Sequence, residues 1–266
     1  MAETDADALD PEIIDPIGRL LAASRSALLI TGAGLSADSG LPTYRGVGGL
    51  YEQELVEEKI PIEEALSGDM MRRNPALCWK YIHQIEAACR GASFNRAHAV
   101  IADLERHMDR VWVLTQNVDG FHHAAGSRNV IPIHGDVHEL ICTQCEWRDR
   151  VQDYAGLAIP PSCADCGAVV RPAVVLFGEL LPQAALRDLA RELEAGFDVV
   201  FSIGTSSLFP YIAQPFVVAA LQGVPTVEIN PAATDVSRFA AHVVRARAKV
   251  AMHAIWQAYR ALADPA

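Results

Sequence analysis

The 266-residue sequence predicts an α/β protein with a doubly wound parallel sheet and a smaller inserted domain made of a helical part and a four-cysteine module. Three observations favour this fold class. Short apolar segments alternate with amphipathic helical segments along most of the chain, and such alternation produces a parallel sheet covered on both faces. Residues 47–94 interrupt the alternation with helical sequence, and residues 139–170 are punctuated by Cys, Pro and Gly. We therefore expect both stretches to be insertions in one large domain.

The first elements of the large domain form two helix–strand pairs. In "IIDPIGRLLAAS" (residues 13–24) the apolar residues recur at helical spacing, and "SALLI" (26–30) is an apolar run of strand length. The pair is repeated by the helical "AHAVIADLERH" (97–107) and the strand-like "VWVLT" (111–115).

The second half of the chain continues the alternation. Strands are predicted for "VVLF" (174–177), "VVFSIG" (199–204), "PTVEIN" (225–230) and "HVVRA" (242–246), and helices for "AALRDLARELEAG" (184–196), "IAQPFVVAALQG" (212–223) and "VAMHAIWQAYRALA" (250–263). The resulting Rossmann-like domain comprises residues 1–46, 95–138 and 171–266, with 47–94 as the helical insertion and 139–170 as the cysteine module.

The charge balance and the N-terminal sequence limit the classes of function. The chain has 22 Lys and Arg against 33 Asp and Glu, a formal net charge of −11. A nucleic-acid groove needs a basic stripe, so we expect no nucleic-acid partner. The N-terminal "MAETDADALD" lacks the basic and apolar regions of a secretory signal, and no apolar run approaches the roughly 20 residues that span a membrane. We expect a cytoplasmic protein without a membrane segment.

A glycine-rich loop follows the first predicted strand. In "TGAGLSADSGLPTYRG" (31–46), Gly32 and Gly34 suit a tight turn where the backbone approaches a ligand. The common dinucleotide fingerprint has its third glycine three residues after the second, whereas Gly40 comes six residues after Gly34. A hydride-transferring dehydrogenase therefore fits poorly, and a glycine-rich loop without a ligand stays open as the alternative.

Four of the cysteines form two CxxC pairs. Cys142 and Cys145 are separated from Cys163 and Cys166 by 17 residues, a spacing typical of structural zinc sites. Four thiolates complete a tetrahedral shell and leave no open position for water. Two disulfides or unrelated buried thiols are the alternatives. We expect one structural Zn²⁺ per chain.

Polar side chains follow other predicted strands. The motif "TQNVDG" places Gln116, Asn117 and Asp119 at the carboxyl end of a strand, where open α/β sheets bind ligands. The motif "IHGDVHEL" places His134 in a loop at the same edge, and "SIGTSS" (202–207) ends a third strand with hydroxyl groups that suit phosphate or ribose. A lone histidine is more often structural, but this loop position favours a role in the site.

Together these motifs resemble those of the sirtuins, the NAD-dependent protein-lysine deacylases, over roughly residues 12–260. The matching stretches are "GAGLSADSGLPTYRG", "TQNVDGFHHAAGS", "IHGDVHEL", the paired CxxC, "VVLFGELLP", "GTSS" and "VEINP", in family order and spacing. The resemblance implies NAD as a consumed co-substrate and acylated lysine side chains of proteins as partners. It implies that NAD is bound by Gly32, Ala33, Gly34, Ser36, Thr43, Tyr44, Arg45, Gln116, Asn117, Asp119, Gly204, Thr205, Ser206, Asn230 and Ala248.

The resemblance also implies a mechanism with His134 as general base and with Asn117 and Asp119 as further catalytic residues. An imidazole suits the base because its pKa lies near the working pH. The acyl-lysine carbonyl oxygen attacks C1′ of the ribose as nicotinamide leaves. The 2′-oxygen then attacks the alkylimidate carbon, and water releases lysine and 2′-O-acyl-ADP-ribose. Val175, Phe177 and Gly178 match the segment that pairs with the substrate peptide as an added strand.

Departures from the family motifs bear on the details. Thr43-Tyr44-Arg45 replaces the common Asp-Phe-Arg, and "GTSSLFPY" is one residue shorter before its proline than in many relatives. Sirtuins that remove succinyl or malonyl groups carry a Tyr-x-x-Arg pair in the helical insertion, where alignment on Pro75 places Ile82 and Ile85. An apolar pocket leaves a carboxylate unpaired, so we expect a preference for acetyl and longer neutral acyl groups. The alternative is that Ile82 and Ile85 are ordinary core residues.

Three other functions stay open from the sequence. The first is mono-ADP-ribosyl transfer to a protein, which uses the same cleavage of NAD. The second is a catalytically silent NAD-binding sensor, against which the intact His134 argues. The third is a zinc-ribbon nucleic-acid binder, which the acidic charge balance disfavours.

Overall fold

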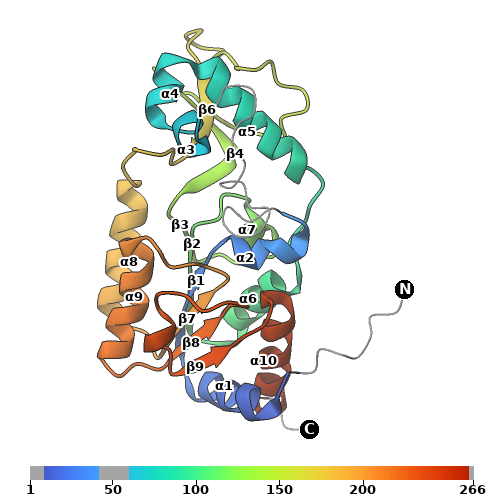
Figure 1. The fold of residues 1–266 in the computed structure, drawn as a ribbon, viewed down its shortest axis with the longest axis vertical. Coiled ribbons are helices and arrows are strands. Elements are labelled where there is room, and N and C mark those ends of the chain that lie inside the picture. The colour runs from blue at the N-terminus through green and yellow to red at the C-terminus, as the bar shows by residue number, and fades with distance from the viewer. Residues whose placement is uncertain (1–8, 42–59, 264–266) are drawn as a thin grey trace.

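The structure is a computed structural model that describes residues 9–41 and 60–263. Its larger unit is built on a six-stranded parallel sheet with the strand order β3-β2-β1-β7-β8-β9 (Figure 1). The strands are β1 (Ser26–Thr31), β2 (Arg110–Thr115), β3 (Val130–Pro132), β7 (Val199–Ile203), β8 (Thr226–Ile229) and β9 (His242–Val244). The order reverses between β1 and β7, and ligands of open α/β sheets bind at the carboxyl ends of the strands beside such a reversal. The predicted fold class is confirmed.

Helices cover both faces of this sheet. One face packs against α1 (Pro11–Ala23), α6 (Arg96–His107) and α10 (Ala248–Ala263), and the other against α8 (Gln183–Ala195) and α9 (Pro210–Leu221) (Figure 1). All six residues of β1 are buried. Leu29 packs in the core between the sheet and α1, α6 and α10, whereas Leu28 and Ile30 pack in the core between the sheet and α8 and α9. This explains why "SALLI" is a continuous apolar run, since a central parallel strand is buried on both sides.

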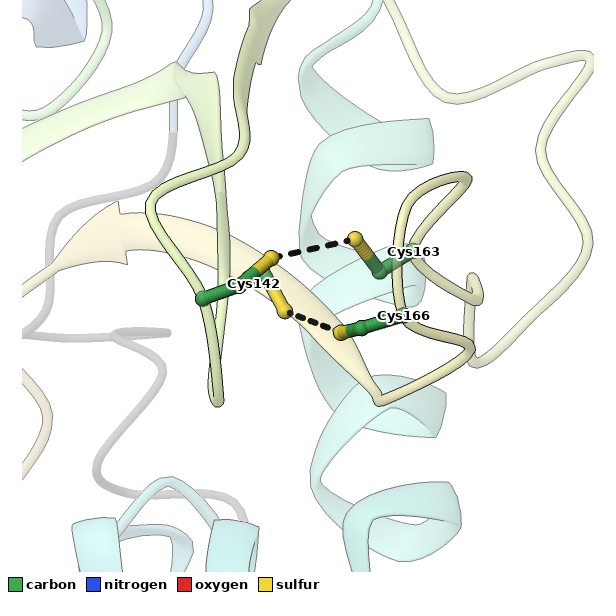
Figure 2. A group of neighbouring side chains, drawn as sticks. Cys142, Cys163 and Cys166 are labelled. Carbon is green, nitrogen blue, oxygen red and sulfur yellow. Dashed lines mark hydrogen bonds between the residues drawn. The ribbon is translucent and has the colours of Figure 1, made fainter.

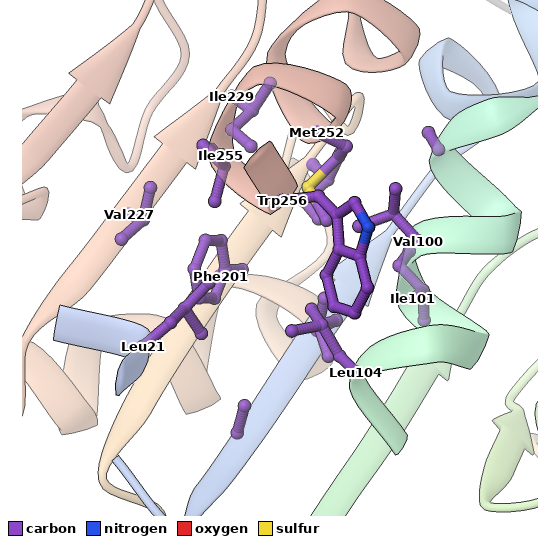
Figure 3. Close-up of a cluster of buried hydrophobic side chains, with 14 of the residues drawn as sticks. Leu21, Val100, Ile101, Leu104, Phe201, Val227, Ile229, Met252, Ile255 and Trp256 are labelled. Atoms are coloured by element: carbon purple, nitrogen blue, oxygen red, sulfur yellow. The ribbon is translucent and has the colours of Figure 1, made fainter. Parts of the chain in front are cut away.

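Figure 3 shows the larger core, where Met252 and Trp256 of α10 lie between α6 and the sheet. Phe201 of β7 lies in the same cluster and is fully buried. Local sequence starts these helices: the Asp10 side chain accepts a hydrogen bond from the Glu12 N–H at the start of α1, and the Asn95 side chain caps α6. Among the described helices, none is both long and apolar enough to cross a membrane.

A smaller unit has its own core. It contains the antiparallel sheet β5-β4-β6, formed by β4 (Gly135–Cys142), β5 (Arg148–Arg150) and β6 (Val170–Val174), and the helices α3 (Ile62–Ala65), α4 (Gly68–Arg73) and α5 (Pro75–Cys89). Trp79 of α5 joins the helix to the sheet, because its indole N–H donates to the Val170 carbonyl at 2.8 Å. Its ring lies edge-on to that of Tyr154, with centroids 5.4 Å apart. Cys142 and Cys163 are buried in the same cluster.

Two strands differ from the sequence-based prediction. Residues 174–177 do not form a strand of the parallel sheet, since Val174 ends β6 of the smaller sheet and the next residues have no regular structure. Their apolar character is explained by Leu176, which is buried in the core of the smaller unit. The outer parallel position is taken instead by β3, whose three residues are too short for a recognisable strand pattern. β4 and β6 also extend across the predicted limits of the cysteine module at residues 139 and 170.

The remaining short elements follow the parallel strands along the chain. They are α2 (Ala33–Ser36) and the 3₁₀ turn η1 (Ala37–Ser39) after β1, α7 (Phe121–Ala124) after β2, and η3 (Ser237–Phe239) after β8.

Candidate active site

The carboxyl ends of the parallel strands and the smaller unit enclose a cavity of about 1240 Å³. Every site residue that was predicted from the sequence and lies in the described part of the chain, apart from the four cysteines, lines this cavity. These residues are Gly32, Ala33, Gly34, Ser36, Ile82, Ile85, Gln116, Asn117, Asp119, His134, Val175, Phe177, Gly178, Gly204, Thr205, Ser206, Asn230 and Ala248. The other three, Thr43, Tyr44 and Arg45, lie outside the described residues.

Glycines allow the loop after β1 to lie directly on the end of β7. The Gly34 N–H donates to the Gly204 carbonyl at 2.8 Å. A Cβ atom on Gly34 would lie 2.8 Å from Cα of Gly204, and one on Gly204 would lie 2.4 Å from the Leu35 nitrogen. Gly204 also has a φ of +59°, in the left-handed region that favours glycine. This loop lacks the glycine spacing of the common fingerprint. Its Gly34 instead allows close contact between the backbone of the loop and that of Gly204.

The polar side chains after β2 are tied to this loop. Nδ2 of Asn117 donates to the Gly32 carbonyl at 3.0 Å and to Oγ of Ser36 at 3.1 Å. The Ser36 hydroxyl in turn donates to Oδ2 of Asp119 at 2.7 Å. Burial raises the pKa of Asp119, although the hydrogen bonds from the Phe121 N–H and the Ser36 hydroxyl oppose this effect. The network fixes one wall of the cavity.

A second set of bonds joins the ends of three strands. Nε2 of Gln116, after β2, donates to Oγ1 of Thr205, after β7, at 2.7 Å. Nδ2 of Asn230, after β8, donates to the Thr205 carbonyl at 3.0 Å. The strand ends that carry the predicted nucleotide-binding residues are thereby held in one arrangement.

His134 lies in the turn between β3 and β4. Its Nδ1 is 3.1 Å from the Gln116 carbonyl oxygen, and its Nε2 is 2.7 Å from the Tyr211 hydroxyl. Burial lowers the pKa of His134 below its ordinary value of 6.5, while the bond to the Gln116 carbonyl opposes this shift. The imidazole is therefore neutral at pH 7, which is the form that accepts a proton.

The four predicted metal ligands meet in the smaller unit, where Cys142 faces Cys163 and Cys166 from a separate turn (Figure 2). The Sγ atoms of Cys142 and Cys166 are 3.4 Å apart, those of Cys145 and Cys163 are 3.6 Å apart, and all four lie within 4.8 Å of one another. Tetrahedral Zn²⁺ with bonds of about 2.3 Å places its sulfurs about 3.8 Å apart. The donor set therefore fits one Zn²⁺, and all six cysteines of the described chain are free of disulfides.

Comparison with known proteins agrees with this geometry. A family model described as the Sir2 family matches residues 32–209, two thirds of the chain. The chain belongs to the Sir2 family. It is 50% identical over 228 residues to the NAD-dependent protein deacylase 2 of Pseudomonas aeruginosa, which covers 84% of this chain and 89% of the relative.

Solved Sir2 structures resemble the whole fold. A Sir2 homolog–NAD complex superposes with a TM-score of 0.83 at 31% identity and covers 98% of each chain. A Sir2–p53 peptide–NAD⁺ complex superposes with a TM-score of 0.79 at 28% identity and covers 94% of this chain and 98% of that one.

The connection after β6, which the sequence predicts to pair with a substrate peptide, is already partly paired within the chain. The Val175 N–H donates to the His134 carbonyl at 2.9 Å. The Phe177 N–H donates to the Leu66 carbonyl, and the Phe177 carbonyl accepts from the Gly68 N–H, each at 3.0 Å. Within residues 9–41 and 60–263, the Val175 carbonyl and the backbone of Gly178 have no hydrogen-bond partner. These groups, rather than those of Phe177, are available to an added strand.

The α5 wall contains an ion pair that the sequence-based reasoning did not include. Ile82 and Ile85 line the cavity, and Glu86 and Arg90 line it beside them. Arg90 is held by two bonds to the Glu86 carboxylate, from Nε at 3.0 Å and from Nη2 at 2.5 Å. Their i, i+4 spacing was visible in the sequence, but not the direction in which the pair points. Because the Nε and Nη2 edge of Arg90 is bound to the Glu86 carboxylate, the charge of Arg90 is already paired in this wall.

Proposed function

We propose that this chain is an NAD-dependent protein-lysine deacylase that removes acetyl and other neutral acyl groups, with nicotinamide and 2′-O-acyl-ADP-ribose as the other products. The observation that carries this proposal is the cavity. The predicted nucleotide-binding, peptide-binding and catalytic residues of the described chain, which come from separate stretches of sequence, all line it around His134. Membership of the Sir2 family and the name of the Pseudomonas aeruginosa relative support the same activity.

In this mechanism each side chain has one task. NAD, when bound, supplies an electrophilic ribose carbon and a leaving group. Gly32 and Gly34 bring backbone to the cofactor, and Asn117 and Asp119 orient its nicotinamide and ribose from a wall that the Ser36 hydroxyl holds in place. Nε2 of His134 accepts the proton of a ribose hydroxyl, and the oxygen of that hydroxyl can then attack the acyl carbon. The Nδ1–H of His134 stays hydrogen-bonded to the Gln116 carbonyl throughout, so the imidazole does not need to change its tautomer.

The fate of the ADP-ribose group tests this proposal against protein mono-ADP-ribosyl transfer. NAD labelled in its adenine is incubated with the enzyme and an acetyl-lysine protein. The proposal expects the label in a small molecule that carries the acetyl group. Label that stays on protein would favour transfer, and no consumption of NAD would favour a silent sensor.

Gly34→Ala tests the role of the loop after β1. The added methyl group clashes with Gly204 and forces the loop off the end of β7, so the Kd for ADP-ribose should rise about tenfold or more. Gly156→Ala is the matched control, because a Cβ atom there meets nothing within 4 Å. Isothermal titration calorimetry measures both, and equal affinities in the two variants would remove this loop from the NAD site.

The α5 wall predicts the acyl preference. A succinyl carboxylate beside Ile82 and Ile85 would be desolvated without a partner, whereas each added methylene of a neutral chain contributes about 0.8 kcal/mol when buried. We expect kcat/KM for acetyl- and longer neutral acyl-peptides to exceed that for the succinyl-peptide by about 100-fold or more. Glu86→Gln, which removes the charge that neutralises Arg90, should narrow this difference. Equal kcat/KM values for acetyl and succinyl peptides of one sequence would contradict this account of the pocket.

Three further features belong to the proposal. The substrates are proteins and not nucleic acids, as the net charge of −11 favours, and the enzyme acts in the cytoplasm. Residues 1–46, 95–138 and 171–266 form the NAD-binding domain. Residues 47–94 are the helical insertion and residues 139–170 the zinc module.

A further inference from the structure

The hydroxyl of Tyr211 is a polar group of the cavity to which the mechanism assigns no role. This residue is the second of α9, directly after the loop that follows β7. The hydroxyl oxygen lies 2.7 Å from Nε2 of His134, and it makes no other hydrogen bond in the described part of the chain. The general base therefore already has a partner in this structure.

The other ring nitrogen of His134 shows which group donates. Nδ1 lies 3.1 Å from the backbone carbonyl oxygen of Gln116, and a carbonyl oxygen accepts but does not donate. Nδ1 therefore carries the proton, and the lone pair of the neutral imidazole is on Nε2. It follows that the Tyr211 hydroxyl donates to this lone pair.

Phe209 holds the tyrosine ring in place. The rings of Phe209 and Tyr211 stack with centroids 5.5 Å apart and planes 15° apart. Both rings stand edge-on to the imidazole of His134, at 6.1 and 5.9 Å. All three side chains line the cavity, so the hydroxyl is held by packing at the point where a ligand would meet the base.

Catalysis needs the same lone pair. In the proposed mechanism a ribose hydroxyl donates its hydrogen to Nε2, and one nitrogen lone pair accepts one such donor at a time. Within the described ranges, no ionisable side chain other than Tyr211 is hydrogen-bonded to His134. The Tyr211 hydroxyl and the ribose hydroxyl therefore compete for one position.

We propose that Tyr211 is a positioning residue that occupies Nε2 of His134 in the ligand-free enzyme and yields this position to a ribose hydroxyl of NAD. This role rests on the proposed function, because it requires the ribose to reach His134. Its consequence is opposite to that of a ligand contact: removal of the hydroxyl removes a competitor, so the ligand binds more tightly.

Isothermal titration calorimetry with ADP-ribose on the wild type, Tyr211→Phe, His134→Ala and the double variant tests the competition. The net contribution of one neutral hydrogen bond predicts that Tyr211→Phe binds ADP-ribose about two- to tenfold more tightly than the wild type. In the His134→Ala background the same substitution should change nothing, because the shared lone pair is gone. Tyr259→Phe, on α10 and outside the cavity wall, should bind as the wild type does.

Weaker binding by Tyr211→Phe, or an equal effect with and without His134, would overturn this assignment. A loss of deacylation of about 100-fold in Tyr211→Phe would also overturn it, since the hydroxyl would then be a relay for the proton. Failure of the wild type and Tyr259→Phe to bind ADP-ribose at all would instead count first against the proposed function.

Discussion

His134→Ala should reduce deacylation by about 10² to 10⁴-fold, the usual contribution of a general base, while the fold and NAD binding are retained. The imidazole is placed for this role by the Gln116 carbonyl, which holds the proton on Nδ1 and leaves Nε2 toward the cavity. Because burial lowers the pKa of His134 below 6.5, the base is neutral above that pH and activity should fall only at lower pH. The measurement is kcat/KM for an acetyl-lysine peptide between pH 5 and 8 at saturating NAD.

His253→Ala is the matched control, since His253 is exposed on α10, away from the cavity wall. It should keep wild-type turnover. Near-normal turnover in His134→Ala, with the melting temperature and the affinity for NAD unchanged, would show that another group is the base.

Replacement of any one of Cys142, Cys145, Cys163 and Cys166 by Ala should lower the melting temperature by about 10 °C or more and abolish activity in parallel. Two of these cysteines are buried in the core of the smaller unit, which also supplies the α5 and β6 walls of the cavity. Loss of the metal therefore opens that core and one side of the active site together. Chelation should have the same effect on the wild type, with recovery on addition of Zn²⁺ and not of Mg²⁺.

Metal content distinguishes this prediction from simple damage to the fold. The wild type and Cys89→Ala, which lies outside the cluster, should each contain one Zn²⁺ per chain. Fully active protein with clearly less than one zinc per chain would contradict a structural role for the metal.

The sequence was most informative where a local pattern has one structural outcome. Residue type and spacing were enough to recognise the buried run of β1, the two CxxC pairs and the glycine-rich loop that contacts Gly204. The run at 174–177 was misassigned because apolar residues mark burial but not the sheet they join, and Leu176 is buried in the smaller unit.

Contacts between distant segments could not be predicted in this way. Glu86 and Arg90 have the spacing of a helical ion pair, but only the packing of α5 shows that they face the cavity. Tyr211 ends the stretch "GTSSLFPY", but nothing in the sequence indicates a role for its hydroxyl. Its hydroxyl meets His134 because α9 begins beside the turn between β3 and β4, two segments 77 residues apart.

The products formed from an acetyl-lysine peptide and NAD test the central claim most directly. Liquid chromatography with mass spectrometry quantifies nicotinamide, deacetylated peptide and O-acetyl-ADP-ribose in one reaction with the purified enzyme. The proposed function predicts that the three products form in equal amounts and that none forms without NAD. Deacetylation that releases free acetate without consuming NAD, or NAD consumption that leaves the peptide acetylated, would contradict it.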